Sequence, residues 1–251
     1  MRALITGASS GIGRDMARYL ATLGWDLVVV ARRTDRLLEL KEELKNVDVM
    51  CITADLSDRA ECFKVYEETK GVHIDMLINN AGFGLAGEFV ETDLLTELRM
   101  IDTNVTALHI LTKLYLKDFV ARDSGTILNV ASSASFMAGP LLNTYYATKN
   151  YVYRLSEAIY QELKEKKSKV KISILCPGPI KTEFLDIANV GFVMGNLKSE
   201  EVAKLAIDKA LKGKLIVIPG FMMKAGKFLL RLIPEKLMLW VSYRIQFKKK
   251  K

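Results

Sequence analysis

The order of apolar and amphipathic segments is the feature that most constrains the fold of this chain. Apolar runs rich in Val, Ile and Leu, without clean polar alternation, predict strands at residues 3–6, 27–31, 49–53, 76–79, 126–131, 171–176 and 215–218. Amphipathic segments near residues 12–23, 35–45, 58–70, 92–121, 146–167 and 199–212 alternate with them. Strands buried on both faces have this composition. The pattern therefore predicts an α/β fold: a doubly wound parallel sheet of about seven strands, with right-handed crossovers and helices on both faces.

The charge is distributed unevenly along the 251 residues. Residues 221–251 contain nine of the 37 basic residues and one of the 29 acidic residues, which leaves 28 of each in residues 1–220. A nucleic-acid-binding body would carry a basic stripe of its own, so no nucleic-acid partner is expected. With no internal repeat or linker before residue 220, we expect one domain at 1–220 and a basic extension at 221–251.

The chain shows no sign of secretion, membrane spanning or metal binding. No leader pattern opens it, and no apolar stretch approaches the length of about 20 residues that a spanning helix needs. Three scattered cysteines, Cys51, Cys62 and Cys176, are expected to be reduced thiols. His73 and His109 lack partners at ligand spacing, so no structural zinc or other metal is expected. These features favour a cytoplasmic protein.

A glycine-rich loop, Thr6 to Gly13 (TGASSGIG), lies between the first predicted strand and helix. Glycines let the backbone approach a ligand closely, and the helix amino terminus presents free N–H groups to an anion. A dinucleotide pyrophosphate is the expected occupant, in a Rossmann-type arrangement. The glycine spacing differs from the common G-x-G-x-x-G form.

A second cluster predicts proton transfer. Tyr145 and Lys149 are four residues apart, which places them on one face of a helix, and Ser132 precedes the tyrosine by thirteen residues. An ammonium group beside a phenol lowers the phenol pKa from its usual value of about 10. The serine hydroxyl is placed to hydrogen-bond the reacting oxygen. A tyrosine–lysine pair alone is also typical of a solvated helix face.

Together these motifs resemble the short-chain dehydrogenases/reductases over about residues 2–220. Asn79-Asn80-Ala81-Gly82 matches the family's N-N-A-G element, and Pro177-Gly178 with Thr182 matches the loop around the nicotinamide. The cofactor-binding residues that the resemblance implies are Gly7, Ser9, Ser10, Gly11, Ile12, Gly13, Asp55, Leu56, Asn80, Ala81, Gly82, Tyr145, Lys149, Pro177, Gly178, Ile180 and Thr182.

The resemblance also implies catalytic roles. Tyr145 would act as general acid or base. Lys149 would lower its pKa and bind the nicotinamide ribose, while Ser132 would orient the substrate oxygen. Asn104 would hold a water that connects the lysine to solvent. Asn129 sets the register that selects Ser132 rather than the adjacent Ser133. The lysine four residues on selects Tyr145 rather than Tyr146.

The end of the second predicted strand bears on the choice of cofactor. NAD enzymes commonly place an acidic residue there, whereas a 2′-phosphate requires arginine. This chain has Arg32 and Arg33 at that position and no acid. We therefore expect NADP(H), with ordinary surface arginines as the alternative interpretation.

Two segments bear on the substrate. The segment between Thr182 and Lys198 is rich in apolar residues. It resembles the family's mobile flap over the substrate, which favours an apolar substrate, but a helix packed on the core would have the same sequence pattern. The extension carries an apolar stripe, a break at Pro234, and then Trp240, Phe247 and terminal lysines. It is compatible with peripheral membrane contact, with a cover over the pocket, or with a subunit interface.

The sequence therefore predicts an NADP(H)-dependent oxidoreductase that acts on an apolar ketone, aldehyde or 3-oxoacyl compound. A non-catalytic NADP-binding or scaffold protein on the same fold is the alternative. The resemblance implies a homodimer or homotetramer. The identity of the substrate and the direction of the reaction stay open.

Overall fold

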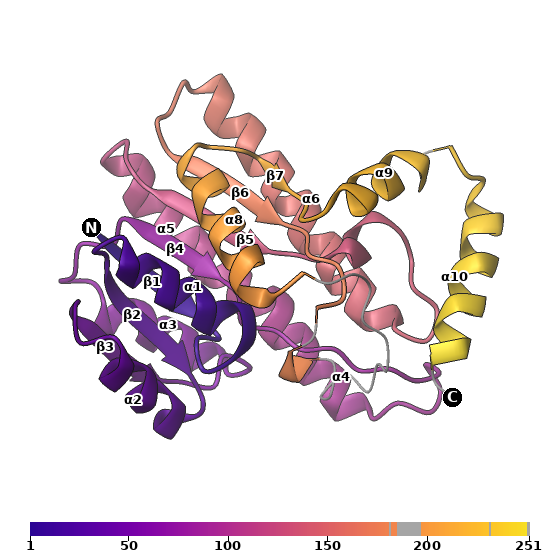
Figure 1. Cartoon of the computed structure of the whole chain (residues 1–251), viewed down its shortest axis with the longest axis horizontal. Coiled ribbons are helices and arrows are strands. Elements are labelled where there is room, and N and C mark those ends of the chain that lie inside the picture. The colour runs from indigo at the N-terminus through magenta and orange to yellow at the C-terminus, as the bar shows by residue number, and fades with distance from the viewer. Residues whose placement is uncertain (181, 185–196, 231, 250–251) are drawn as a thin grey trace.

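A parallel sheet of seven strands organises the molecule (Figure 1). The computed structural model describes residues 1–180, 182–184, 197–230 and 232–249. The strand order is β3-β2-β1-β4-β5-β6-β7, and all neighbouring strands pair in parallel. The strands are β1 (Arg2–Thr6), β2 (Asp26–Ala31), β3 (Val49–Thr53), β4 (Met76–Asn79), β5 (Thr126–Val130), β6 (Lys171–Leu175) and β7 (Ile216–Val217). The predicted doubly wound α/β fold is confirmed.

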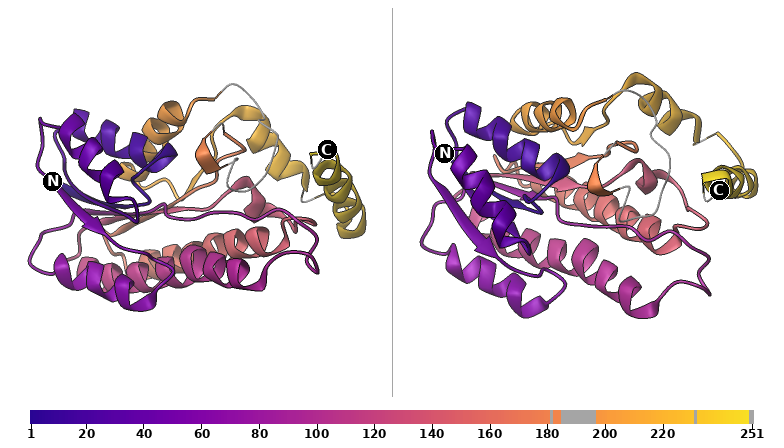
Figure 2. Two further views of the ribbon diagram at one scale, coloured as in Figure 1. Left: turned by 90° about the horizontal axis from the view of Figure 1, so that it is seen from below. Right: turned by 60° about the horizontal axis from the view of Figure 1, so that its bottom comes forward.

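Helices cover both faces of the sheet (Figure 2). One layer contains α1 (Gly11–Thr22), α2 (Thr34–Glu43) and α8 (Ser199–Leu211), and the other contains α3 (Arg59–Glu68), α5 (Leu108–Ala121) and α6 (Asn143–Glu165). In α1 the buried residues Gly13, Met16, Ala17, Leu20 and Ala21 recur at helical spacing, so one stripe faces the strands. The strands read as continuous apolar runs because each is buried between two such layers.

The predicted helix at 92–121 contains three parts. It comprises α4 (Leu94–Ile101), a π-helical segment η1 (Asp102–Ala107) and α5. The side chain of Asp93 caps α4 by accepting a hydrogen bond from the N–H of Thr96. A π-helical turn inside a longer helix is rare and is frequently found at a functional site. The apolar periodicity of the sequence does not reveal this change of helix type.

Buried polar side chains join the central strands to the helix beneath them. Asn79 at the end of β4 donates hydrogen bonds to Asn129 of β5 and to Thr112 of α5, each 2.9 Å long. Asn129 in turn donates to the hydroxyl oxygen of Ser156 in α6 at 2.9 Å. Because unpaired amides are costly inside a protein, these bonds set how α6 lies against the sheet.

The extension after residue 220 forms two helices. They are α9 (Phe221–Leu230) and α10 (Glu235–Lys249), drawn in yellow in Figure 1, and the chain turns between them near Pro234. Proline cannot continue a helix but is well tolerated just before one, which accounts for the break. No helix in the described part of the chain is both long and apolar enough to cross a membrane.

Candidate functional site

The glycine loop lies against the loop that follows β4. Gly7 has a φ of +68°, and a Cβ atom there would lie 2.8 Å from the Cα of Ala81. A Cβ on Gly13 would lie 2.4 Å from the carbonyl oxygen of Gly7 and 2.3 Å from Nδ2 of Asn80. The Asn80 side chain donates to the carbonyl oxygens of Thr6 and Gly7. Any side chain at either glycine would separate the two loops.

The loop leaves the amino terminus of α1 open. Ser10 occupies the N-cap position but makes no side-chain capping bond, so the first N–H groups of the helix stay available. Gly7, Ser9, Ser10, Gly11 and Ile12 line a cavity of about 540 Å³ at the carboxyl ends of the strands. Diverging crossovers from β1 and β4 create such a crevice, and an open α/β sheet binds its ligands there.

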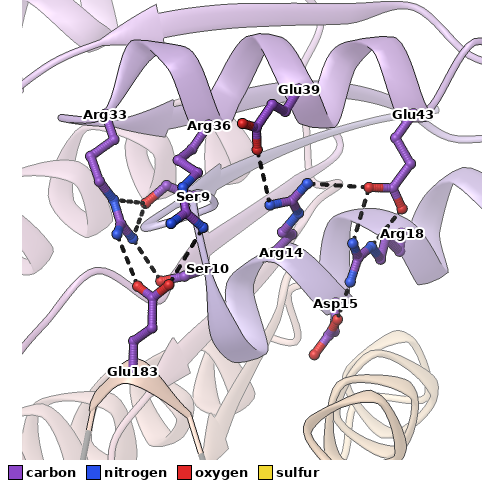
Figure 3. Close-up of polar contacts among 10 residues, drawn as sticks. All are labelled: Ser9, Ser10, Arg14, Asp15, Arg18, Arg33, Arg36, Glu39, Glu43 and Glu183. Atoms are coloured by element: carbon purple, nitrogen blue, oxygen red, sulfur yellow. Dashed lines mark hydrogen bonds and ion pairs between the residues drawn. The ribbon is translucent and has the colours of Figure 1, made fainter. Parts of the chain in front are cut away.

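A carboxylate already occupies an anion-binding cluster beside this loop (Figure 3). The guanidinium of Arg33 donates to Oε2 of Glu183 at 2.9 Å and to the hydroxyl groups of Ser9 and Ser10. Arg36 lies 3.5 Å from the other oxygen of Glu183. The hydrogen bond from Arg33 holds the pKa of Glu183 below its usual range. The Glu183 carboxylate thus stands in for a phosphate group, and these residues fit one.

The charge of the neighbouring Arg32 acts on Asp55. Arg32 is exposed, and it lines the cavity together with Asp55 and Leu56. Burial raises the pKa of Asp55, but hydrogen bonds from Ser57 and the charges of Arg32 and Arg99 outweigh this effect, and the net shift is downward. Of the two arginines predicted to hold a 2′-phosphate, Arg33 is the one that binds the carboxylate.

Three of the four residues predicted to be catalytic, namely Ser132, Tyr145 and Lys149, line the same cavity, and Asn104 does not. Ser132 follows β5 and begins a short 3₁₀ helix, η2 (Ser133–Phe136), where its hydroxyl accepts a bond from the N–H of Ala134. Tyr145 and Lys149 lie in the first two turns of α6. The ammonium nitrogen of Lys149 lies 6.0 Å from the centre of the Tyr145 ring and donates to the carbonyl oxygen of Val130 at 2.9 Å. Both side chains are buried, with Lys149 only 4% exposed.

Burial dominates the acid–base properties of this pair. It raises the pKa of Tyr145, against a smaller lowering by a hydrogen bond with Ser132. It also lowers the pKa of Lys149 to about 8. The expected lowering of the Tyr145 pKa by Lys149 is not found in this structure, because desolvation of the phenolate is the larger effect. Tyr145 is therefore a protonated phenol at neutral pH.

Asn104 lies in the π-helical segment η1 and holds the loop that follows β4. Its amide nitrogen donates to the carbonyl oxygen of Phe83 at 2.9 Å, and its oxygen accepts from the N–H of Phe83 at 3.0 Å. The amide nitrogen also donates to Thr148, next to Lys149, at 3.1 Å. A Cβ atom on Gly82 would lie 2.8 Å from Oδ1 of Asn104 and 3.4 Å from Nζ of Lys149. Asn104 thus lies behind Gly82, close to the lysine.

Most of the predicted cofactor residues line this cavity. The loops after β2, β3, β4 and β6 contribute Arg32, Arg33, Asp55, Leu56, Asn80, Ala81, Gly82, Pro177, Gly178, Ile180 and Thr182. Gly13 and Asn104 do not line it, and they support the loops that do. Sequence reasoning missed Arg36, Phe83, Leu142, Tyr146, Glu183, Phe184 and Gln246 as site residues, although Glu183 and Phe184 directly follow the Thr182 motif.

The predicted flap lies largely outside the described residues. Phe184, in its described part, places its ring centre 5.4 Å from that of Tyr145. Phe184 packs with the cluster formed by Met100, Ala134, Leu142, Tyr145 and Tyr146. The wall of the cavity beside Tyr145 is therefore mainly apolar.

Comparison with known proteins identifies the class to which this fold and site belong. A family model for short chain dehydrogenases matches residues 1–189. The chain therefore belongs to the short-chain dehydrogenase/reductase family, whose members are nicotinamide-dependent oxidoreductases.

Individual relatives agree with this assignment. Very-long-chain 3-oxoacyl-CoA reductase of Rattus norvegicus is 33% identical over 171 residues, which are 65% of this chain and 55% of that protein. A short-chain dehydrogenase from Sphingobium yanoikuyae in complex with NADPH is 30% identical, with a TM-score of 0.81 over 93% of this chain and 96% of that one. A short-chain dehydrogenase/reductase from Burkholderia phymatum in complex with NAD, 23% identical, shares the fold with a TM-score of 0.83 over 91% and 92% of the two chains.

The close approach of Gly13 to its neighbours generates a prediction. Replacement of Gly13 by alanine should destabilise the protein by about 1–3 kcal/mol, because the new Cβ would clash with the carbonyl oxygen of Gly7 at 2.4 Å and the amide nitrogen of Asn80 at 2.3 Å. It should also abolish dinucleotide binding, because the two loops must separate. Urea unfolding and a fluorescence titration with NADPH measure the two effects.

Gly71→Ala is the matched control, since nothing lies within 4 Å of a Cβ at that position. Its stability should stay within about 0.5 kcal/mol of the parent. If Gly13→Ala behaved like Gly71→Ala in both assays, the contact between the two loops would not matter for binding.

Proposed function

We propose that this chain is an NADP(H)-dependent oxidoreductase that interconverts a carbonyl group and an alcohol on an apolar substrate. The observation that carries the proposal is the meeting of Ser132, Tyr145 and Lys149 with the glycine loop in one cavity. A scaffold protein would need neither the buried lysine nor the phenol beside it. The substrate class and the cofactor are inferences from this chain's own residues.

The residues around the cavity suit a nicotinamide dinucleotide. The open amino terminus of α1 would bind the pyrophosphate, Asp55 and Leu56 would contact the adenine, and Lys149 would bind the nicotinamide ribose. Pro177, Gly178, Ile180 and Thr182 would border the nicotinamide ring. When bound, the nicotinamide gives or takes the hydride in the reaction.

The case for NADP(H) rests on Arg33. Its guanidinium is held by Ser9 and Ser10 with a carboxylate in front of it, which is the arrangement that a 2′-phosphate requires. Glu183 would have to leave this position for a phosphate to bind. An NAD enzyme would place an acid at the end of β2, and this chain has none there.

Tyr145 is suited to the direction of carbonyl reduction. Burial keeps its phenol protonated at neutral pH, so it can donate a proton to the oxygen of a substrate carbonyl. Ser132 would hold the same oxygen by a hydrogen bond. Lys149 stays close to the phenol because its ammonium group is bonded to the carbonyl oxygen of Val130. The positive charge of Lys149 would lower the free-energy cost of the negative charge that Tyr145 acquires when it donates its proton.

The lining of the cavity favours an apolar substrate. Phe83, Leu142 and Phe184 lie around the catalytic tyrosine. Burial of apolar substrate surface against such side chains contributes about 25 cal/mol per Å². A ketone, an aldehyde or a 3-oxoacyl compound meets these requirements, and the similarity to a 3-oxoacyl-CoA reductase agrees with the last of these.

The proposed proton donor generates a prediction. In a panel of carbonyl substrates followed by NADPH absorbance, Tyr145→Phe should lower kcat by at least about 100-fold, the usual contribution of a general acid. NADPH should still bind, because the phenyl ring keeps the packing around Phe184. Tyr160→Phe, on the opposite end of α6, is the control and should keep full activity. Full activity of Tyr145→Phe would exclude the proposed mechanism.

The choice of cofactor generates a second prediction. Arg33→Ala should weaken NADPH binding by about 10- to 100-fold, the loss expected for hydrogen bonds between charged groups, and leave NADH binding within about threefold. Arg59→Ala, an exposed arginine outside the cavity, should change neither. Equal losses for both cofactors, or a preference for NADH in the parent protein, would contradict the assignment of NADP(H).

We also propose that the outer face of the extension contacts an anionic membrane surface. Phe221, Met222, Phe228 and Trp240 are more than half exposed, and the segment carries nine basic residues against one acidic residue. An exposed apolar surface beside clustered basic residues is the combination that binds an anionic bilayer interface.

Vesicle flotation tests this contact with the full-length chain. The protein should float with vesicles that contain anionic lipid, and less so in high salt, because salt screens the lysines. Phe228→Ser combined with Trp240→Ser should abolish flotation, whereas Phe63→Ser, an exposed phenylalanine on α3, should not. Equal flotation of all three proteins would remove the membrane proposal.

A further inference from the structure

The helix α10 buries two polar side chains, while Met238 and Leu239 are half-buried and several other apolar residues of the helix are exposed. Among the side chains described in this helix, Ser242 and Gln246 are buried, at 4% and 8% exposure, and they lie one turn apart on the same face. Trp240 and Phe247 are 58% and 42% exposed. A helix packed on an apolar core has the opposite arrangement. The two most buried side chains described in α10 are therefore polar rather than apolar.

Gln246 reaches the catalytic cavity through Tyr146. Its amide nitrogen donates to the phenol oxygen of Tyr146 at 2.8 Å, and its side chain lines the cavity that contains Tyr145. The Tyr146 ring packs on the backbone of Gly139, where a Cβ atom would lie 2.3 Å from the ring. Its centre lies 6.2 Å from that of Tyr145. The position of Gln246 relative to the catalytic tyrosine is thus set by a rigid neighbour.

Polar groups on this face have unused hydrogen-bonding capacity. Among the described residues, the hydroxyl of Ser242 is buried without any hydrogen-bond partner. Gln246 uses one N–H in its bond to Tyr146, and its amide retains a second N–H and a carbonyl oxygen. Buried polar groups without partners are costly, and they are rare unless a ligand or a functional role accounts for them.

The polar groups of Ser242 and Gln246 contrast with the apolar side chains around Tyr145. The walls near Tyr145 come mainly from Phe83, Leu142 and Phe184, none of which offers a hydrogen bond from its side chain. Ser132 and Tyr145 hold the reacting oxygen of a substrate. Gln246 joins the same cavity from α10, bonded to the Tyr146 phenol, whose ring centre lies 6.2 Å from that of Tyr145. A substrate in the cavity can therefore meet polar groups at Ser132 and Tyr145 and again at Gln246.

We propose that Gln246 and Ser242, with Gln246 held by Tyr146, form a second polar subsite that binds a hydroxyl or carbonyl oxygen remote from the reacting carbonyl. The inference rests on the proposed carbonyl–alcohol function and narrows its substrate class. The substrate is an apolar compound with two oxygen-bearing positions, one reduced or oxidised at Tyr145 and one bound under α10. A substrate without the second oxygen leaves Gln246 and Ser242 without partners, so the site discriminates against it.

Methyl ketones of graded chain length, each with and without a terminal hydroxyl group, test this subsite. At the length that spans the cavity, the parent protein should show a kcat/KM for the hydroxylated ketone about tenfold above that of the plain ketone. Gln246→Leu should reduce this ratio to within about twofold, whatever its effect on the absolute rate. Ile245→Ala, on the outer face of the same helix, should leave the ratio unchanged.

A second variant, Ser242→Ala, distinguishes loss of the subsite from unfolding of α10. This change removes one buried hydroxyl without a partner, so the ligand-free protein should be as stable as the parent, while the preference ratio falls about threefold. A merely structural role for Ser242 would not lower the ratio at unchanged stability. A preference that survives both Gln246→Leu and Ser242→Ala would overturn the subsite.

Calorimetric binding of the same ketone pairs to the NADPH-loaded protein separates the two proposals. If no ketone is reduced but the hydroxylated member still binds about tenfold more tightly through Gln246, the proposed reaction is wrong and the subsite stands. If ketones are reduced with equal kcat/KM and equal affinity for both members at every length, the reaction stands and the subsite is wrong.

Discussion

The close contact between the glycine loop and the loop after β4 is the interaction on which the rest of the site depends. Asn80 donates to the carbonyl oxygens of Thr6 and Gly7, and the hydroxyl of Thr6 accepts from the N–H groups of Asn80 and Ala81. These bonds tie the cofactor-binding half of the sheet to the catalytic half across the switch in strand order. They form only because Gly7 and Gly13 have no side chains to keep the loops apart.

Around β5 and α6, hydrogen bonds between buried polar side chains hold Tyr145 and Lys149 in place, although burial of these two polar groups is itself unfavourable. The chain from Asn79 through Asn129 to Ser156 places α6 against β5, and α6 carries Tyr145 and Lys149. Ser135 adds a second tie, since its hydroxyl donates to the carbonyl oxygen of Lys149 at 2.8 Å. The same burial keeps Tyr145 protonated and lowers the pKa of Lys149 to about 8. One packing arrangement thus sets both the geometry and the proton affinity of the site.

Sequence patterns predicted the parts of the cavity that belong to local motifs. The strands were predictable because burial on both faces demands continuous apolar runs, and the proximity of Ser132, Tyr145 and Lys149 because their spacing follows from one strand end and one helix. Contacts between distant segments were not predictable. Glu183 meets Arg33 across 150 positions, and Gln246 meets Tyr146 across 100. Local periodicity carries no signal for such pairs. Local periodicity also gives no indication of the π-helical turn that positions Asn104.

The amino-acid sequence by itself determined the α/β architecture, the glycine loop and the spacing of Ser132, Tyr145 and Lys149, because each depends on position along the chain. The direction of the Tyr145 pKa shift was decided only by the tertiary structure, since desolvation depends on everything packed around the phenol. Tertiary structure also decided which arginine faces an anion and which side of α10 turns inward. The sequence shows a basic, apolar extension, but only packing against Tyr146 turns its Gln246 toward the cavity that contains Tyr145.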